Sequence, residues 1–255
     1  MDLYANVIGE GKPLLILHGF LGMGDNWKTL AKRYADEMNY QVHLIDQRNH
    51  GRSPHCDEFN YDLLAADLKS YMDKNNMSSA DLIGHSMGGK TVMTFSAHFP
   101  TYVNKMIVVD IAPKYYAPHH QQILEGLTAV DEACFESRKD ADDLLSKYIK
   151  IKSIRQFLLK NLYRKNKKEY GLRVNLDSLK ANINEIGKAL KANETFEGQT
   201  LFINGKKSDY ITAEDNNLIK NHFPNSKIQP IQNAGHWVHA EQQDEFYNVT
   251  SAFLA

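Results

Sequence analysis

Ser86 stands between two glycines in the stretch L-I-G-H-S-M-G-G-K-T, residues 82–91. Gly84 and Gly88 give the spacing G-x-S-x-G, in which a sharp strand-to-helix turn exposes the serine hydroxyl. A serine hydroxyl needs a general base, because it is too weak an acid to react alone near neutral pH. The spacing therefore predicts that Ser86 is a nucleophile for acyl transfer, whereas a serine that is merely small enough for the turn would need no such base.

His236 is the predicted base. It lies in N-A-G-H-W-V-H-A-E, residues 233–241, a glycine-containing loop that follows the last strand-like run. A loop at that place can reach back over the edge of a sheet. His239, three residues later, is the alternative, although an exposed or capping histidine would have the same spacing.

Two aspartates are candidates for the third member of a triad. Asp110 closes the run K-M-I-V-V-D, and Asp209 follows L-F-I-N-G-K-K-S. Both lie between the serine and the histidine in chain order, at the end of a strand-like run. A carboxylate there would hold the histidine in its reactive tautomer and stabilise the imidazolium. The spacing alone leaves both aspartates open.

The backbone N–H groups of Phe20 and Met87 are the predicted oxyanion donors. Met87 follows the serine at a helix N-terminus, where the helix dipole also favours negative charge. Phe20 lies in H-G-F-L-G-M-G-D-N-W, whose glycines let the chain curl close to a substrate carbonyl. Because these groups need no further chemistry, we expect no metal.

The elements that position these groups follow an alternating pattern. Short apolar runs alternate with stretches of helical periodicity, which predicts an α/β fold with a mostly parallel sheet flanked by helices. The runs are K-P-L-L-I-L-H-G, Y-Q-V-H-L-I-D, A-D-L-I-G, K-M-I-V-V-D, Q-T-L-F-I-N-G and K-I-Q-P-I. In such sheets ligands gather at the carboxyl ends of the strands, where the candidate residues fall.

The alternation stops between residues 115 and 194, which contain helical segments but no convincing strand. We expect a helical lid at 115–194, inserted between two late strands of one core formed by 1–114 and 195–255. Residues 147–168 in this lid carry nine Lys/Arg and no acid. A solvated surface and a site for an anionic substrate tail are the two interpretations.

The composition is that of an ordinary globular protein. The 255 residues are 42% hydrophobic and 24% charged, with a net charge of −1. Cys56 and Cys134 are far apart, so no disulfide framework or zinc site is indicated. Neither a signal peptide nor a run of about 18 apolar residues is present. We expect a cytoplasmic monomer with no nucleic-acid partner and no stable membrane insertion.

Six motifs resemble those of the α/β-hydrolase superfamily, and more narrowly of the bacterial YbfF-type esterases and mitochondrial ABHD-type hydrolases. The motifs are H-G-F-L-G, D-Q-R-N-H-G-R-S-P, G-H-S-M-G-G-K, D-I-A-P, Q-F-L-L-K-N and G-H-W-V-H-A-E. The resemblance covers Pro13 to Glu241. It implies an α/β-hydrolase fold and hydrolysis of a small-molecule acyl ester or thioester through an acyl-enzyme on Ser86, without a cofactor.

The resemblance also separates the two aspartates. In most α/β-hydrolases the acid stands three residues after the glycine of the seventh strand, but here Ser208 takes that place after Gly205. YbfF-type sequences likewise carry a serine there and keep the aspartate of D-I-A-P. The resemblance therefore implies Asp110 as the acid, with Asp209 as the alternative.

Two other functions remain as alternatives on the same fold. Lyases of menaquinone synthesis resemble the H-G-F and S-M-G-G motifs, usually with arginine where this chain has Lys90. A hydrolase-like receptor would keep the triad with little turnover. The physiological substrate, its chain length and the use of acyl-CoA stay open.

Overall fold

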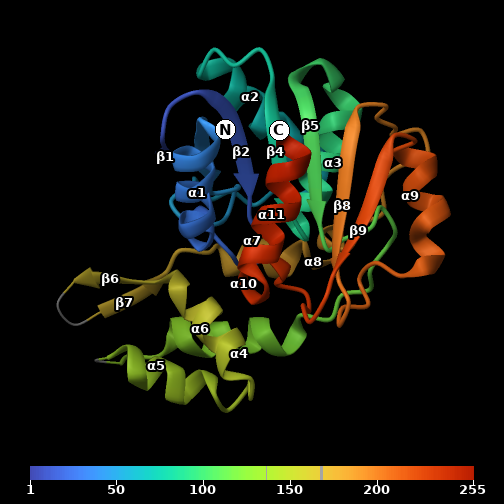
Figure 1. Cartoon of the computed structure of the whole chain (residues 1–255). Coiled ribbons are helices and arrows are strands. Elements are labelled where there is room, and N and C mark those ends of the chain that lie inside the picture. The colour runs from blue at the N-terminus through green and yellow to red at the C-terminus, as the bar shows by residue number, and fades with distance from the viewer. Residues whose placement is uncertain (136, 167–168) are drawn as a thin grey trace.

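A seven-stranded sheet forms the centre of the computed structural model, which describes residues 1–135, 137–166 and 169–255 (Figure 1). The strand order is β1-β3-β2-β4-β5-β8-β9. The strands are β1 (Ala5–Ile8), β2 (Lys12–Leu17), β3 (Tyr40–Ile45), β4 (Ala80–His85), β5 (Val103–Val109), β8 (Gln199–Gly205) and β9 (Ser226–Ile231). Only β1 pairs antiparallel among these described strands, so the predicted mostly parallel sheet is confirmed.

Helices cover both faces of this sheet. They are α1 (Lys28–Met38), α2 (Tyr61–Lys74), α3 (Met87–His98), α9 (Asn216–His222), α10 (Val238–Glu241) and α11 (Gln243–Leu254). Leu15 and Leu17 of β2 pack in a cluster with α2 and α3, whereas Leu14 and Ile16 pack in a second cluster with α1 and α11. All four side chains are buried, because helices on both sides exclude water from a central parallel strand.

The segment between β5 and β8 lies beyond the carboxyl ends of the strands, at the bottom of Figure 1. It contains α4 (Gln121–Glu132), α5 (Arg138–Leu145), α6 (Lys152–Leu158), β6 (Leu162–Asn166), β7 (Glu169–Leu172), α7 (Leu176–Ala181) and α8 (Ile183–Ile186). The expectation that this segment lacks strands was wrong, because β6 and β7 form an antiparallel hairpin. Most of β6 is exposed, so its charged sequence shows no apolar alternation.

The segment predicted to be a lid shares a buried apolar cluster with the sheet-bearing part of the chain. Leu127, Leu145 and Leu158 belong to one buried cluster with Phe20 and Met87. The lid therefore packs directly on the two segments predicted to hold an oxyanion. Among the described residues, no helix combines the length and the apolar character required to cross a membrane.

Candidate active site

Ser86 occupies a strained turn between β4 and α3. Its φ of 51° and ψ of −114° lie outside the regions that residues with side chains prefer. The turn requires glycine on both sides, since a Cβ on Gly84 would lie 2.2 Å from the Gly88 oxygen and one on Gly88 would lie 2.4 Å from the Leu17 oxygen. The Ser86 N–H donates to the Val109 carbonyl at 2.9 Å, which ties the turn to β5.

Asp110 and His236 meet next to this turn, although they come from different loops. His236 Nδ1 lies 2.8 Å from Asp110 Oδ2. The carboxylate is fully buried and accepts two further hydrogen bonds, from the Gly205 N–H at 3.1 Å and the Ser208 hydroxyl at 2.5 Å. Donors on both oxygens stabilise the negative charge that this position needs.

The contacts of His236 fix which ring nitrogen faces outward. With Nδ1–H donated to the carboxylate, Nε2 keeps its lone pair and can accept a proton. The ring stacks on Tyr210, with 4.0 Å between centroids and 20° between planes. The His236 carbonyl accepts a hydrogen bond from His85 Nε2 at 2.9 Å. His236 is therefore held at its ring and at its backbone.

The alternative residues lie elsewhere. His239 is buried and stacks on Trp27 at 3.9 Å, and burial lowers its pKa to about 3. Asp209 is exposed, whereas Asp110 is the aspartate in contact with His236. The geometry thus brings one of the two candidate acids to the ring.

The loop after β2 has a fixed peptide orientation. The Gly19 carbonyl accepts hydrogen bonds from the Gly22 N–H at 2.9 Å and from His18 Nδ1 at 2.8 Å. In a trans peptide the following N–H points the opposite way, so the Phe20 N–H direction is set by these two bonds. Burial lowers the pKa of His18 to about 4, which keeps its ring neutral.

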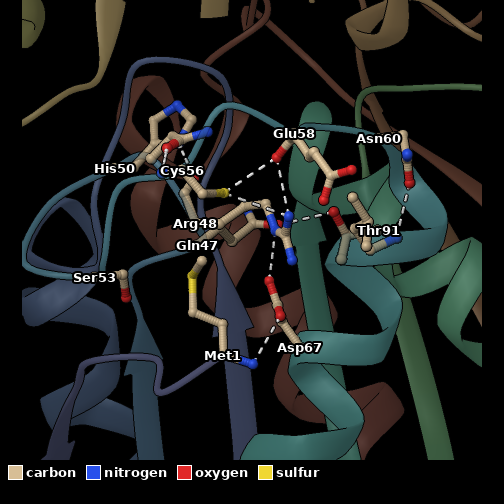
Figure 2. Close-up of polar contacts among 12 residues, drawn as sticks. Met1, Gln47, Arg48, His50, Ser53, Cys56, Glu58, Asn60, Asp67 and Thr91 are labelled. Carbon is tan, nitrogen blue, oxygen red and sulfur yellow. Dashed lines mark hydrogen bonds and ion pairs between the residues drawn. The ribbon is translucent and has the colours of Figure 1, made fainter. Parts of the chain in front are cut away.

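The loop after β3, which carries Gln47 and His50 (Figure 2), forms hydrogen bonds to the loop after β2. Gln47 donates from its backbone to His18 Nε2 at 3.0 Å and from its side chain to the His18 carbonyl at 2.7 Å, and it accepts a bond from Thr91 of α3 at 2.8 Å. His50 Nε2 accepts from the Leu21 N–H at 3.2 Å. The oxyanion loop is therefore tied to the same helix that Ser86 opens.

An ion pair anchors the β3 loop to α2. Arg48 Nε lies 2.6 Å from Asp67 Oδ2, and both side chains are buried (Figure 2). Asp46 accepts the backbone N–H groups of Gly24 at 2.7 Å and Arg52 at 2.9 Å. These contacts fix the conformation of the loop, and we assign its residues a structural role and no catalytic one.

Two cavities meet at Ser86. The larger has a volume of about 250 Å³ and the smaller about 20 Å³. Five residues line both of them: Phe20, Ser86, His119, His120 and Tyr210. Ser86 thus borders two adjoining spaces of very unequal size.

Several residues of the site carried no functional prediction. His119 and His120 line both cavities, and His119 Nε2 lies 2.8 Å from the Tyr210 hydroxyl. Ser208 was noted only as the residue in place of the usual acid, and its hydroxyl bonds to Asp110. The serine at this position was the one feature of the sequence that pointed to its contact with Asp110.

The basic segment of the lid is mostly solvated where the structure describes it. Lys147, Lys150 and Lys152 are exposed, and Arg155 pairs with Asp142 at 2.7 Å. Lys167 and Lys168, which belong to the predicted basic run, lie outside the described residues. Binding of an anionic substrate tail by this segment stays a prediction.

One group of potential metal ligands lies at the end of the lid. Ligand atoms of Asp62, His98 and Glu194 are all within 4.8 Å of one another. The Lys191 ammonium lies 2.9 Å from Asp62 and 3.8 Å from Glu194, so it already offsets part of their charge. The arrangement is an ion-pair network that joins the lid to α2 and α3.

Residues 12–243 match the family model described as alpha/beta hydrolase fold. The chain is 37% identical over 252 residues to the sn-1-specific diacylglycerol lipase ABHD11 of Danio rerio, covering 96% of this chain and 79% of that protein. It is 31% identical to Esterase YbfF of Escherichia coli (strain K12), covering 96% and 94%. A solved structure, "Marine microorganism esterase", has a TM-score of 0.94 and 43% identity, covering 99% of both chains.

Proposed function

The chain belongs to the alpha/beta hydrolase fold family, and from that premise we propose that it is a serine esterase working through Ser86, His236 and Asp110. The observation that carries this proposal is the 2.8 Å contact between His236 Nδ1 and the buried Asp110 carboxylate, beside a cavity that Ser86 and His236 both line. An imidazole oriented by that contact can act as a general base through Nε2.

The first half of the reaction acylates Ser86. His236 Nε2 takes the hydroxyl proton while Ser86 Oγ bonds to the ester carbonyl carbon. The N–H groups of Phe20 and Met87 donate to the carbonyl oxygen as it becomes negative. The bond from the carbonyl carbon to the alcohol oxygen then breaks, and His236 returns its proton to that oxygen as the alcohol leaves.

The second half releases the acid. Water gives a proton to His236 Nε2 while its oxygen bonds to the acyl carbon. The bond to Ser86 Oγ breaks, and the serine recovers the proton from His236. In both halves Asp110 stabilises the imidazolium through Nδ1, and Ser208 helps to hold that carboxylate in place by donating a hydrogen bond to it.

A carboxylic ester is the substrate class that we propose. One relative is named a diacylglycerol lipase and another an esterase, so both names describe cleavage of ester bonds. A thioester is the second substrate that the same steps accommodate, because a thiolate is also protonated by the histidine as it leaves. A cytoplasmic location and a monomeric state stay predictions.

Labelling with a fluorophosphonate probe, combined with hydrolysis of a p-nitrophenyl ester, tests this proposal. We expect the wild type to be labelled and active, Ser86→Ala to be neither, and Ser251→Ala, at a half-buried serine on α11 whose hydroxyl donates to the Asn248 carbonyl, to match the wild type in both assays. A wild type that resists the probe would overturn the proposal. Labelling without turnover would instead favour the receptor-like alternative.

A further inference from the structure

The two cavities at Ser86 offer very different amounts of space. A cavity of roughly 10–15 Å³ is needed to hold one water-sized group. The smaller cavity, at about 20 Å³, therefore has room for only a small group. The larger one, at about 250 Å³, admits a bulky substituent. An ester that reacts at Ser86 must place one substituent in each.

The position of His236 decides which substituent goes where. His236 and Trp237 line the large cavity, whereas Met87 and Lys90 line the small one. His236 must deliver its proton to the leaving alcohol oxygen, so that oxygen has to lie on the side of His236. The rest of the alcohol then continues into the large cavity. The acyl chain, on the other side of the carbonyl carbon, points past Met87 into the small cavity.

The small cavity ends at a lysine that is held in place. Lys90 is buried, and its ammonium donates to the carbonyls of Lys114 and Lys188 at 2.5 Å each. Moving this side chain aside would leave two carbonyls without a donor, which costs free energy. A second fixed wall is Tyr116, whose hydroxyl donates to the Tyr210 carbonyl at 2.6 Å. The acyl side therefore cannot lengthen by simple side-chain rotation.

The large cavity has the opposite character. Ile123, Ile154 and Phe157 of the lid contribute to its wall, together with Trp237 of the core. Phe157 and Trp237 lie 5.9 Å apart between ring centroids, so an aromatic pair borders the space. These side chains favour an apolar alcohol substituent and offer it no charged group to pair with.

We propose that the protein selects esters in which a short acyl group, acetyl or propionyl, is joined to a larger apolar alcohol. This inference rests on the proposed function and specifies its substrate class. Selection acts at acylation: a longer acyl chain collides with the wall formed by Lys90, Tyr116 and Ile186 before the carbonyl reaches Ser86. A longer alcohol meets no such barrier.

A two-way ester panel tests this selectivity. One series varies the acyl group from acetyl to octanoyl on a fixed alcohol, and the other varies the alcohol from ethyl to octyl on a fixed acetyl group. We expect kcat/KM of the wild type to fall by about tenfold or more between propionyl and hexanoyl, since a misfitting methylene costs that much in a closed pocket. Along the alcohol series kcat/KM should stay level or rise.

Matched lid variants locate the barrier. Ile186→Ala enlarges the small cavity, and Ile154→Ala enlarges the large one. We expect Ile186→Ala to raise kcat/KM for hexanoyl relative to acetyl esters by about tenfold, and Ile154→Ala to leave that ratio unchanged.

Three results would overturn the inference: a wild type that prefers long acyl chains, a wild type indifferent to acyl length, or an acyl-length limit relieved by Ile154→Ala. The first two results are measured on the wild type, so they test the inference even if a variant folds poorly. Each of the three presupposes ester turnover and labelling of Ser86, which separates them from failure of the proposed function itself.

Discussion

The carboxyl edge of the sheet and the lid contribute to the same site in different ways. At the sheet edge, Ser86, Asp110 and His236 are each fixed by hydrogen bonds to neighbouring backbone or buried side chains. The lid supplies cavity walls such as Ile154 and Ile186. In the proposed mechanism all the reacting groups lie at the sheet edge, whereas the cavity walls combine lid residues with core residues such as Lys90 and Trp237. The difference teaches that substitutions in the lid can reshape the cavities without replacing a reacting group.

The two regions nevertheless touch at the loops behind the site. Asn161 of the lid donates to the Leu21 carbonyl at 2.8 Å, directly after the predicted oxyanion donor. Asn49 of the β3 loop donates to Ser178 of α7 at 2.9 Å. The lid is thus attached to the loops that shape the oxyanion site, and the comparison can be tested at these contacts.

The largest effect should come from the carboxylate at the sheet edge. We expect Asp110→Asn to lower kcat for an activated ester by about 10⁴-fold, because the histidine loses its orienting carboxylate. The measurement is steady-state hydrolysis at pH 7.5. Asp209→Asn is the matched control and should stay close to the wild type, since Asp209 is exposed. The reverse pattern would show that the acid was assigned to the wrong strand.

The second-largest effect should be a loss of folding stability at acid pH, caused by buried histidines in the core loops. Burial lowers the pKa of His18 to about 4, and burial together with the nearby His18 ring lowers that of His50 to about 3. An unfolded histidine titrates near 6.5, so below that pH the unfolded chain binds more protons than the folded one. The stability that these neutral rings give is complete above pH 6.5 and is lost as the pH falls toward 4, by up to about 1.4 kcal/mol per pH unit for each ring.

Urea unfolding at pH 7.0 and 5.0 checks this expectation for the core loops. The loss of stability between the two values should be smaller in His50→Gln, which has one proton fewer to take up. A wild type that is equally stable at both pH values would contradict the assignment of these histidines as buried and neutral.

A smaller effect should follow from removing the hydrogen bond between the lid and the loop that carries Phe20 and Leu21. Asn161→Ala removes the donor to the Leu21 carbonyl, and we expect a loss of about 1–3 kcal/mol in stability together with a lower kcat. Asn182→Ala removes another lid-to-core bond, to the Asp57 carbonyl at 2.8 Å, far in sequence from the oxyanion loop. The control should lose stability without losing kcat. Equal kcat values in both variants would mean that the lid does not support the oxyanion loop.

The sequence predicted most of the sheet because the central strands are buried on both faces and therefore read as continuous apolar runs. The run K-M-I-V-V-D, for example, falls within β5 and its following residue. The sequence did not predict β1, because none of its four residues is fully buried. The β6–β7 hairpin escaped for the same reason, as its outer residues face solvent.

Part of the site could also be predicted, because it depends on local sequence. The glycine spacing identified Ser86 because backbone crowding, a local effect, demands glycine there. The contact between Ser208 and Asp110 and the stack of Tyr210 on His236 depend on how distant loops meet. No local pattern encodes such contacts, and so spacing left two aspartates open.

The lid begins and ends at nearly the same point of the core. The Tyr116 N–H donates to the Gly187 carbonyl at 2.8 Å, and the Leu190 N–H donates to the Pro113 carbonyl at 2.9 Å. A segment whose ends already touch adds little loop-closure cost to the domain that carries it, whatever its length. For protein engineering, the segment between these two pairs of residues can be exchanged as a unit. A lid from another protein, with matching ends, can be joined there to give the same sheet edge a different substrate range.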